Sequence, residues 1–177
     1  MNTLTKVAPW ALLLGPVVAV NSIAAVYMSD EQSVTSIFKD SKFTRNTFQL
    51  TDEEKKLVEE TSGDKVRTPQ FVLWTNTSKD CVFVDQVLGK HEFITYAVGV
   101  TQEGRVKGVE ILEYRESYGH QIKNETWRKQ FQSKSKDEPF KLDDDIKNIS
   151  GATLSASHVT SGVKRILITY DIIKKRI

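Results

Sequence analysis

The stretch from residue 70 to residue 114 constrains the fold more than any other part of the chain, because it contains several short runs of β-branched and aromatic residues. Such residues pack well on the half-buried surface of a sheet. Residues 102–105 form a tight turn between two of the runs, and a local hairpin of this kind predicts antiparallel pairing. We therefore expect a mainly antiparallel sheet whose strands include residues 71–74, 82–84, 92–100 and 106–114.

Helices are predicted on both sides of this sheet-forming region. Before it, residues 33–38 form a short amphipathic pattern and residues 52–60 a second helix, which Thr51 and Glu54 begin with a capping box. After it we expect a short helix around 127–131 and a long one over about 155–174. One apolar stripe at spacings of three and four marks the last helix: Val159, Val163, Ile166, Tyr170 and Ile173. Strands and helices that are segregated in this way indicate an α+β fold, a sheet with flanking helices.

The N-terminus has the features of an export signal. Lys6 precedes an uncharged, largely apolar stretch over residues 7–29. The stretch also has the roughly 20 residues needed to span a bilayer, although its prolines and glycine favour a cleaved signal. We expect a signal peptide or N-terminal membrane anchor over 1–28, an N-terminal helical segment over 29–69 and one further domain over 70–177. The protein is then periplasmic or otherwise extracytoplasmic, either free or anchored to the inner membrane.

Composition argues against two classes of function. The formal net charge is +2, and lysine and arginine are interspersed with acidic residues, so no basic stripe for nucleic acid is predicted. Cys81 is the only cysteine, which excludes an internal disulfide and a cysteine-based metal site. His91 and His120 lie on different elements without a metal-ligand spacing, and no metal site is expected.

The run Ser150-Gly151-Ala152-Thr153 stands just before the last predicted helix. A helix N-terminus attracts phosphate, because its backbone N–H groups are unpaired and its dipole is positive. Gly151 and Ala152 allow a close approach, Ser150 and Ser155 offer hydrogen-bond donors, and the Thr153 hydroxyl can form a phosphoester. The alternative is an ordinary loop in which a serine or threonine caps the helix without any ligand.

The same run resembles the flavinylation motif of the FMN-binding domain family. That family includes the covalent-flavin subunits of the sodium-translocating NADH:quinone reductase and Rnf complexes, and other exported electron-transfer proteins. The resemblance implies that Thr153 receives FMN through its phosphate from a dedicated flavin transferase. The family commonly has an acidic residue at the position of Lys147, and here Asp144 and Asp145 lie close by.

Residues 85–92, which lead into the long strand, also carry the resemblance. Lys90 in this stretch can approach the phosphate, and the alternative is that a lysine next to Gly89 is a solvated turn residue. A second region, residues 113–122, carries the resemblance further. Its Glu-Ser-Tyr-Gly-His run is similar to a loop that lies beside the flavin in exported FMN-binding domains, and the likeness covers about residues 70–175. Tyr118 is then expected to stack on the flavin ring; the alternative is a plain surface turn over 117–119. The resemblance implies that FMN is bound by Glu116, Ser117, Tyr118, Gly119, His120, Ser150, Gly151, Ala152, Leu154 and Ser155.

The resemblance implies an exported electron-transfer flavoprotein that holds FMN covalently. Its partners would be membrane-bound or exported redox proteins with haem or iron–sulfur centres, for which this sequence has no ligand set of its own. No general base, nucleophile or substrate pocket is evident, so we expect a carrier subunit without catalytic residues rather than an independent enzyme. Two alternatives stay open: an FMN-dependent reductase of small molecules, and a binding or assembly module without flavin.

Overall fold

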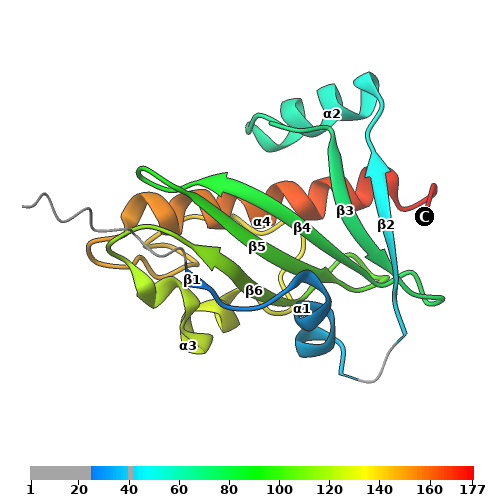
Figure 1. Cartoon of the computed structure of the whole chain (residues 1–177). Helices are drawn as coiled ribbons and strands as arrows, with labels where there is room; N and C mark the ends of the chain where they lie inside the picture. The colour runs from blue at the N-terminus through cyan, green and yellow to red at the C-terminus, as the bar shows by residue number, and fades with distance from the viewer. Residues whose placement is uncertain (1–24, 40–41) are drawn as a thin grey trace, which may run out of the picture.

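A computed structural model of the protein describes residues 25–39 and 42–177. Its centre is an antiparallel sheet in which the strands follow the order β1-β6-β5-β4-β3-β2 (Figure 1). The four predicted strand runs and their antiparallel pairing are confirmed. The strands are β1 (Ala25–Val26), β2 (Thr44–Gln49), β3 (Gln70–Thr75), β4 (Cys81–Leu88), β5 (Phe93–Val100) and β6 (Val106–Tyr114).

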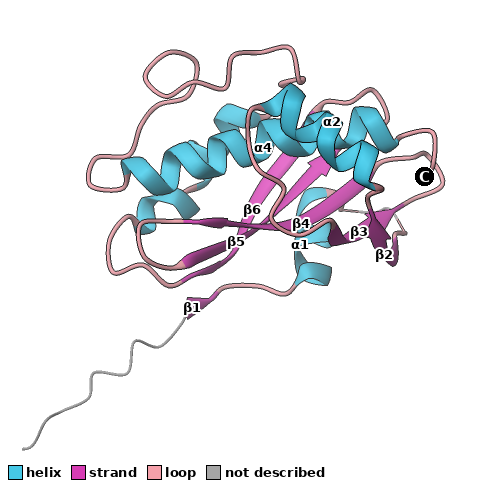
Figure 2. Ribbon diagram, turned by 90° about the horizontal axis from the view of Figure 1, so that it is seen from above, coloured by secondary structure: helices cyan, strands magenta, loops and turns pink. Residues whose placement is uncertain are grey.

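Helices cover both faces of the sheet (Figures 1 and 2). One face carries α2 (Asp52–Ser62) and the long helix α4 (Thr153–Ile173), and the other carries α1 (Asp30–Ile37). Short helices η1 (His120–Lys123), α3 (Glu125–Arg128) and η2 (Lys129–Phe131) follow β6. This arrangement confirms the predicted α+β fold with flanking helices.

Burial of the predicted apolar stripe fixes α4 against the sheet. All five stripe residues are buried and belong to one apolar core with strands β3 to β6. Burying a side chain of this size stabilises the fold by about 1.5–3 kcal/mol. Gly162 on the same helix faces Tyr96 of β5, and a Cβ there would lie 2.2 Å from the Tyr96 hydroxyl oxygen. The helix therefore approaches the sheet more closely than any larger residue would allow.

On the opposite face, α1 packs against two glycines of the sheet. Gly99 and Gly108 are paired across β5 and β6. A Cβ at Gly99 would lie 2.4 Å from the Ile37 side chain, so the missing side chain is what admits α1. Phe38 and Val34 join Ile37 in a second, smaller apolar cluster on this face.

The segment 29–69 contains the two predicted helices and also a strand that was not predicted. The capping box of α2 is present, since the Thr51 hydroxyl accepts from the Glu54 N–H at 3.2 Å and the Glu54 carboxylate accepts from the Thr51 N–H at 2.9 Å. Strand β2, however, has polar and mostly exposed residues without the apolar alternation of a strand. Its pairing with β3 at the sheet edge supplies the register that its own sequence lacks.

Most of the predicted export signal or anchor, residues 1–24, lies outside the described residues. The chain is described from Ala25, where β1 pairs with the end of β6 through Ala25–Tyr114 and Val26–Glu113. Within residues 25–39 and 42–177, no helix combines the length and apolar character needed to cross a membrane.

Candidate functional site

The two motif regions meet at one end of the sheet and enclose a cavity. The cavity has a volume of about 420 Å³, within the roughly 300–1,000 Å³ typical of ligand sites. Eight of its ten lining residues are predicted site residues, from the loop after β6 and from the entry to α4. The lining consists of Lys90, His91, Glu116, Ser117, Tyr118, Gly151, Ala152, Thr153, Leu154 and Ser155.

Thr153 is the first residue of α4, and its side chain is exposed at the cavity. The N-cap of the helix is Ala152, and no side chain in the described part of the chain caps it. The alternative of a serine or threonine cap is therefore wrong. The first N–H groups of α4 stay available to a ligand at the positive end of the helix dipole. Gly151 has φ of 79°, a left-handed conformation that favours glycine, and it brings the chain into the helix.

Tyr114, at the end of β6, joins the two motif regions. Its hydroxyl donates to the backbone carbonyl of Tyr118 and lies 3.3 Å from the Ser155 hydroxyl. Because a tyrosine has one hydroxyl hydrogen, Ser155 is the donor in the second bond. Burial raises the pKa of Tyr114; the Ser155 hydrogen bond lowers it, and the nearby Glu116 charge raises it again. Tyr114 was predicted to end a strand and to begin the stretch 113–122 that shares the resemblance, but it was not assigned to the site, since its partners lie 4 and 41 residues away.

Three predicted ligand residues do not line the cavity: Gly119, His120 and Ser150. Gly119 has φ of 88°, and a Cβ there would lie 2.3 Å from the Ala152 Cβ. It serves the close contact between the loop and the entry to α4. His120 packs edge-on against Tyr114, with ring centroids 5.5 Å apart.

Glu116, a predicted ligand contact, lines the cavity and is also hydrogen bonded to the protein backbone. Its buried carboxylate accepts hydrogen bonds from the N–H groups of His91, at 2.6 Å, and Glu92, at 3.1 Å. Burial acts to raise the pKa of Glu116, but backbone hydrogen bonds from residues 90–92 outweigh it, so the pKa is lowered. A Cβ at Gly89 would lie 2.5 Å from this carboxylate, which explains the glycine. Glu116 therefore organises the turn 89–92.

That turn brings two residues to the cavity that sequence analysis did not assign to the site. Lys90 and His91 both line it with exposed side chains. Residues 85–92 are part of the family resemblance, and an approach of Lys90 to the phosphate was one interpretation of the sequence. A lysine next to a glycine is, however, typical of a solvated turn, so neither residue was assigned to the site. Their place depends on Glu116, which is 25 residues from His91 along the chain.

Comparison with protein families links this part of the chain to FMN. Residues 89–168 match the family model described as the FMN-binding domain. The chain contains an FMN-binding domain. All ten cavity-lining residues fall within the matched segment. The predicted FMN-binding family is confirmed and FMN is supported as its cofactor, while covalent attachment stays a prediction. The likeness to the quinone-reductase and Rnf subunits stays a prediction. A search of curated proteins found no match.

The lining of the FMN-binding domain's cavity fits the chemical parts of FMN. A flavin needs apolar contacts on its ring, hydrogen bonds along its polar edge and a site for its phosphate. Tyr118 and Leu154 are 80% and 49% exposed at the cavity, so both have surface free for a ring. The Ser117 hydroxyl and the N–H groups at the start of α4 are polar partners on the same wall.

The loop before α4 is held largely by hydrogen bonds of its backbone. Lys147 has an exposed side chain, while its N–H donates to Gln130 and its carbonyl accepts from the Trp127 indole, both at 2.7 Å. Asp145 accepts from the Lys134 ammonium at 2.9 Å and from backbone N–H groups of residues 140 and 141. Of the two acids near Lys147, Asp145 is thus engaged within the protein, and Asp144 is exposed.

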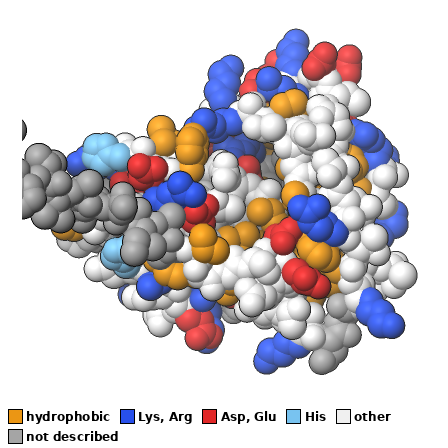
Figure 3. Space-filling view, viewed as in Figure 1, with side chains coloured by type: hydrophobic (Ala, Val, Ile, Leu, Met, Phe, Trp, Pro, Cys, Tyr) orange, Lys and Arg blue, Asp and Glu red, His pale blue; other side chains and the backbone are white. Residues whose placement is uncertain are grey.

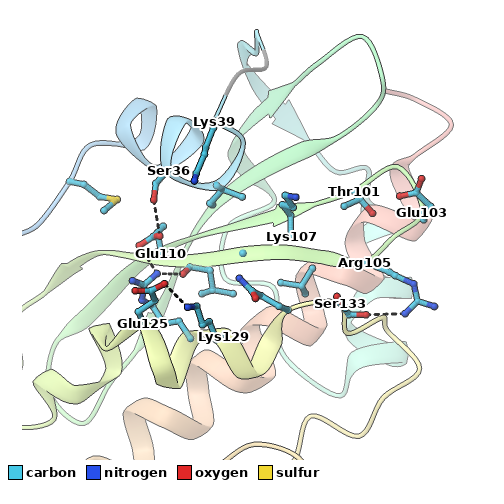
Figure 4. Close-up of a pocket in the computed structure, with 17 residues that line it drawn as sticks. Ser36, Lys39, Thr101, Glu103, Arg105, Lys107, Glu110, Glu125, Lys129 and Ser133 are labelled. Atoms are coloured by element: carbon cyan, nitrogen blue, oxygen red, sulfur yellow. Dashed lines mark hydrogen bonds and ion pairs between the residues drawn. The ribbon is translucent and has the colours of Figure 1, made fainter.

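A larger groove, of about 840 Å³, lies between α1, β6 and the α3–η2 segment (Figure 4). No predicted FMN-site residue lines it. Its acidic groups are partly paired: Glu110 is bonded to Arg128 at 2.6 Å and to Ser36 at 3.0 Å. On the face shown in Figure 3, basic and acidic side chains are interspersed. The groove shares no lining residue with the cavity around Thr153.

Proposed function

We propose that the protein is an exported electron-transfer flavoprotein that carries FMN covalently on Thr153. The observation that carries this proposal is the position of the Thr153 hydroxyl. It is exposed in the cavity of an FMN-binding domain, at the N-terminus of a 21-residue helix. It makes no hydrogen bond with another described residue, and so it is open to esterification by a flavin transferase.

The surrounding residues support a phosphoester at this position. The unpaired N–H groups in the first turn of α4 can donate to the phosphate oxygens, and the helix dipole favours their negative charge. Tyr118 and Leu154 can cover the ring, and Tyr114 holds the Tyr118 loop against α4. The bound FMN would supply exchange of electrons with partners, and the chain would attach and orient it.

The proposed export and the proposed partners are supported by the apolar N-terminal stretch and by the proposed covalent bond between FMN and Thr153. The apolar stretch over residues 7–29 supports export, or anchoring to the inner membrane. Outside the cytoplasm lost FMN is not readily replaced, so a covalent bond keeps the carrier loaded. The partners we propose are the flavin transferase for maturation and membrane-bound or exported redox proteins with haem or iron–sulfur centres.

The test is co-expression of the full chain with a flavin transferase. Flavin fluorescence should survive on a denaturing gel, and the mass should increase by that of FMN less one water. Thr153→Ala should abolish both signals. Ser157→Ala, which removes a half-buried hydroxyl one turn further along α4, is the matched control and should retain them.

Two results would overturn the proposal. Fluorescence that persists in Thr153→Ala places the attachment on another residue. A wild-type protein without covalent flavin removes the covalent carrier altogether. Turnover of a small substrate without any redox partner protein would instead favour the FMN-dependent reductase.

A further inference from the structure

The turn 89–92 is held beside α4 from two sides. The Glu116 carboxylate accepts from its backbone N–H groups, as described above. On the other side, the backbone carbonyl of Leu88 is hydrogen bonded to the His158 ring. His158 lies four residues after Leu154, so both side chains are on the same face of α4. The two contacts fix the turn next to the first turns of the helix.

Lys90 is an unneutralised cation in this position. Its side chain is exposed, lines the cavity and makes no ion pair with any described residue. The Glu116 carboxylate, which also lines the cavity, accepts from the N–H groups of His91 and Glu92 through its Oε1 and forms no ion pair with Lys90. The cavity thus combines the positive end of α4 with a free ammonium group two residues after the Leu88 contact.

We infer that Lys90 binds the phosphate of FMN and so makes the cavity select the phosphorylated flavin over riboflavin. This inference rests on the proposed FMN site around Thr153. A lysine is a point charge suited to a phosphate oxygen, and a hydrogen bond between charged groups is about twice as strong as a neutral one. The ring-facing residues, Tyr118 and Leu154, are common to both ligands and give no such selection.

The experiment separates binding from attachment. In the Thr153→Ala background, where no ester forms, FMN and riboflavin are each titrated against the full chain by flavin fluorescence. Lys90→Gln should weaken FMN binding by about tenfold to a hundredfold and leave riboflavin binding unchanged. Lys90→Arg should restore most of the FMN affinity, and added salt should weaken FMN binding less in Lys90→Gln than in its parent.

Lys107→Gln is the matched control. Lys107 is an exposed lysine on the α1 side of the sheet, in the larger groove (Figure 4). Its replacement changes net charge equally and should leave both affinities unchanged. An unaltered ratio of FMN to riboflavin affinity in Lys90→Gln overturns the inference about Lys90 while the FMN site stands. Equal weakening of both ligands overturns it too, since Lys90 would then face the ring. Failure of the parent to bind either flavin overturns the site and the inference together.

Discussion

Replacing Tyr114 by phenylalanine tests whether one hydroxyl holds the FMN site together. The ring is 1% exposed, and phenylalanine preserves its packing. The hydroxyl bonds to the Tyr118 carbonyl and the Ser155 hydroxyl are lost. Ser155 is 3% exposed, so its hydroxyl has little access to water as a substitute partner.

The expected cost follows from these two bonds. A buried polar group left without its partner costs about 1–3 kcal/mol. A loss of about 2 kcal/mol in the free energy of unfolding lowers the Tm of a chain of this size by about 4–8 °C. The affinity for FMN should fall as well, because the loop that carries Tyr118 is no longer tied to α4.

Tyr170→Phe provides the matched control. The Tyr170 hydroxyl likewise has two partners, the carbonyls of Lys79 at 3.2 Å and Gln102 at 3.1 Å, which share its one hydrogen towards the far end of α4. Thermal unfolding should show a similar loss in both variants. Fluorescence titration with FMN should show weaker binding in Tyr114→Phe alone. Equal FMN affinities in the two variants, whether both weakened or both unchanged, would refute the role of Tyr114.

Three further variants test contacts that the fold requires. Gly162→Ala places a Cβ 2.2 Å from the Tyr96 hydroxyl oxygen and should lower the unfolding free energy by about 1–3 kcal/mol. The measurement is urea unfolding, and an unchanged midpoint of the unfolding curve would contradict the close approach of α4. Gly119→Ala places an alanine in a left-handed backbone conformation, which costs about 1–2 kcal/mol, and its Cβ clashes with Ala152. Both the FMN affinity and the Tm should therefore fall. Normal FMN binding would show that the loop tolerates a side chain at this position. Asp145→Asn should lower the unfolding free energy relative to wild type at pH 7. The difference should shrink at pH values below 3.8, the ordinary pKa of an aspartate carboxyl group. Burial acts to raise the pKa of Asp145, but Lys134 and backbone N–H groups lower it overall, so its stabilisation is complete above that value and lost as the pH falls through the lower folded pKa. A difference from wild type that is the same at pH 7 and pH 3 would contradict this assignment.

The elements predicted from the sequence are those whose signal is local. Strands β3 to β6 carry their own β-branched and aromatic runs, and α4 carries its own apolar stripe. Strand β2 was missed because its residues are polar and exposed, and only pairing with β3 makes it a strand. The two-residue β1 is likewise defined by its partner β6.

The candidate site also contains residues with a local sequence signal and residues whose role depends on tertiary contacts. Its eight predicted lining residues occupy two short continuous segments, each with its own motif. Lys90 and His91 come from a third segment, within the stretch 85–92 that shares the resemblance, but neither was assigned to the site; Glu116 lines the cavity as predicted and also supports that segment. The role of Tyr114 could not be predicted either, because the sequence of a strand does not show which distant group a tyrosine hydroxyl bonds to.

The sequence by itself determined the α+β class, the hairpin of β5 and β6, the long final helix and the likeness to FMN-binding domains. These depend on side-chain periodicity and on motifs confined to a few consecutive residues. Only the tertiary structure decided that Ala152 rather than a hydroxyl residue is the N-cap, and that Lys90 stands beside α4. The physical reason is that these facts depend on contacts such as His91–Glu116 and Leu88–His158, between residues 25 and 70 positions apart, which form only when the sheet and α4 are packed.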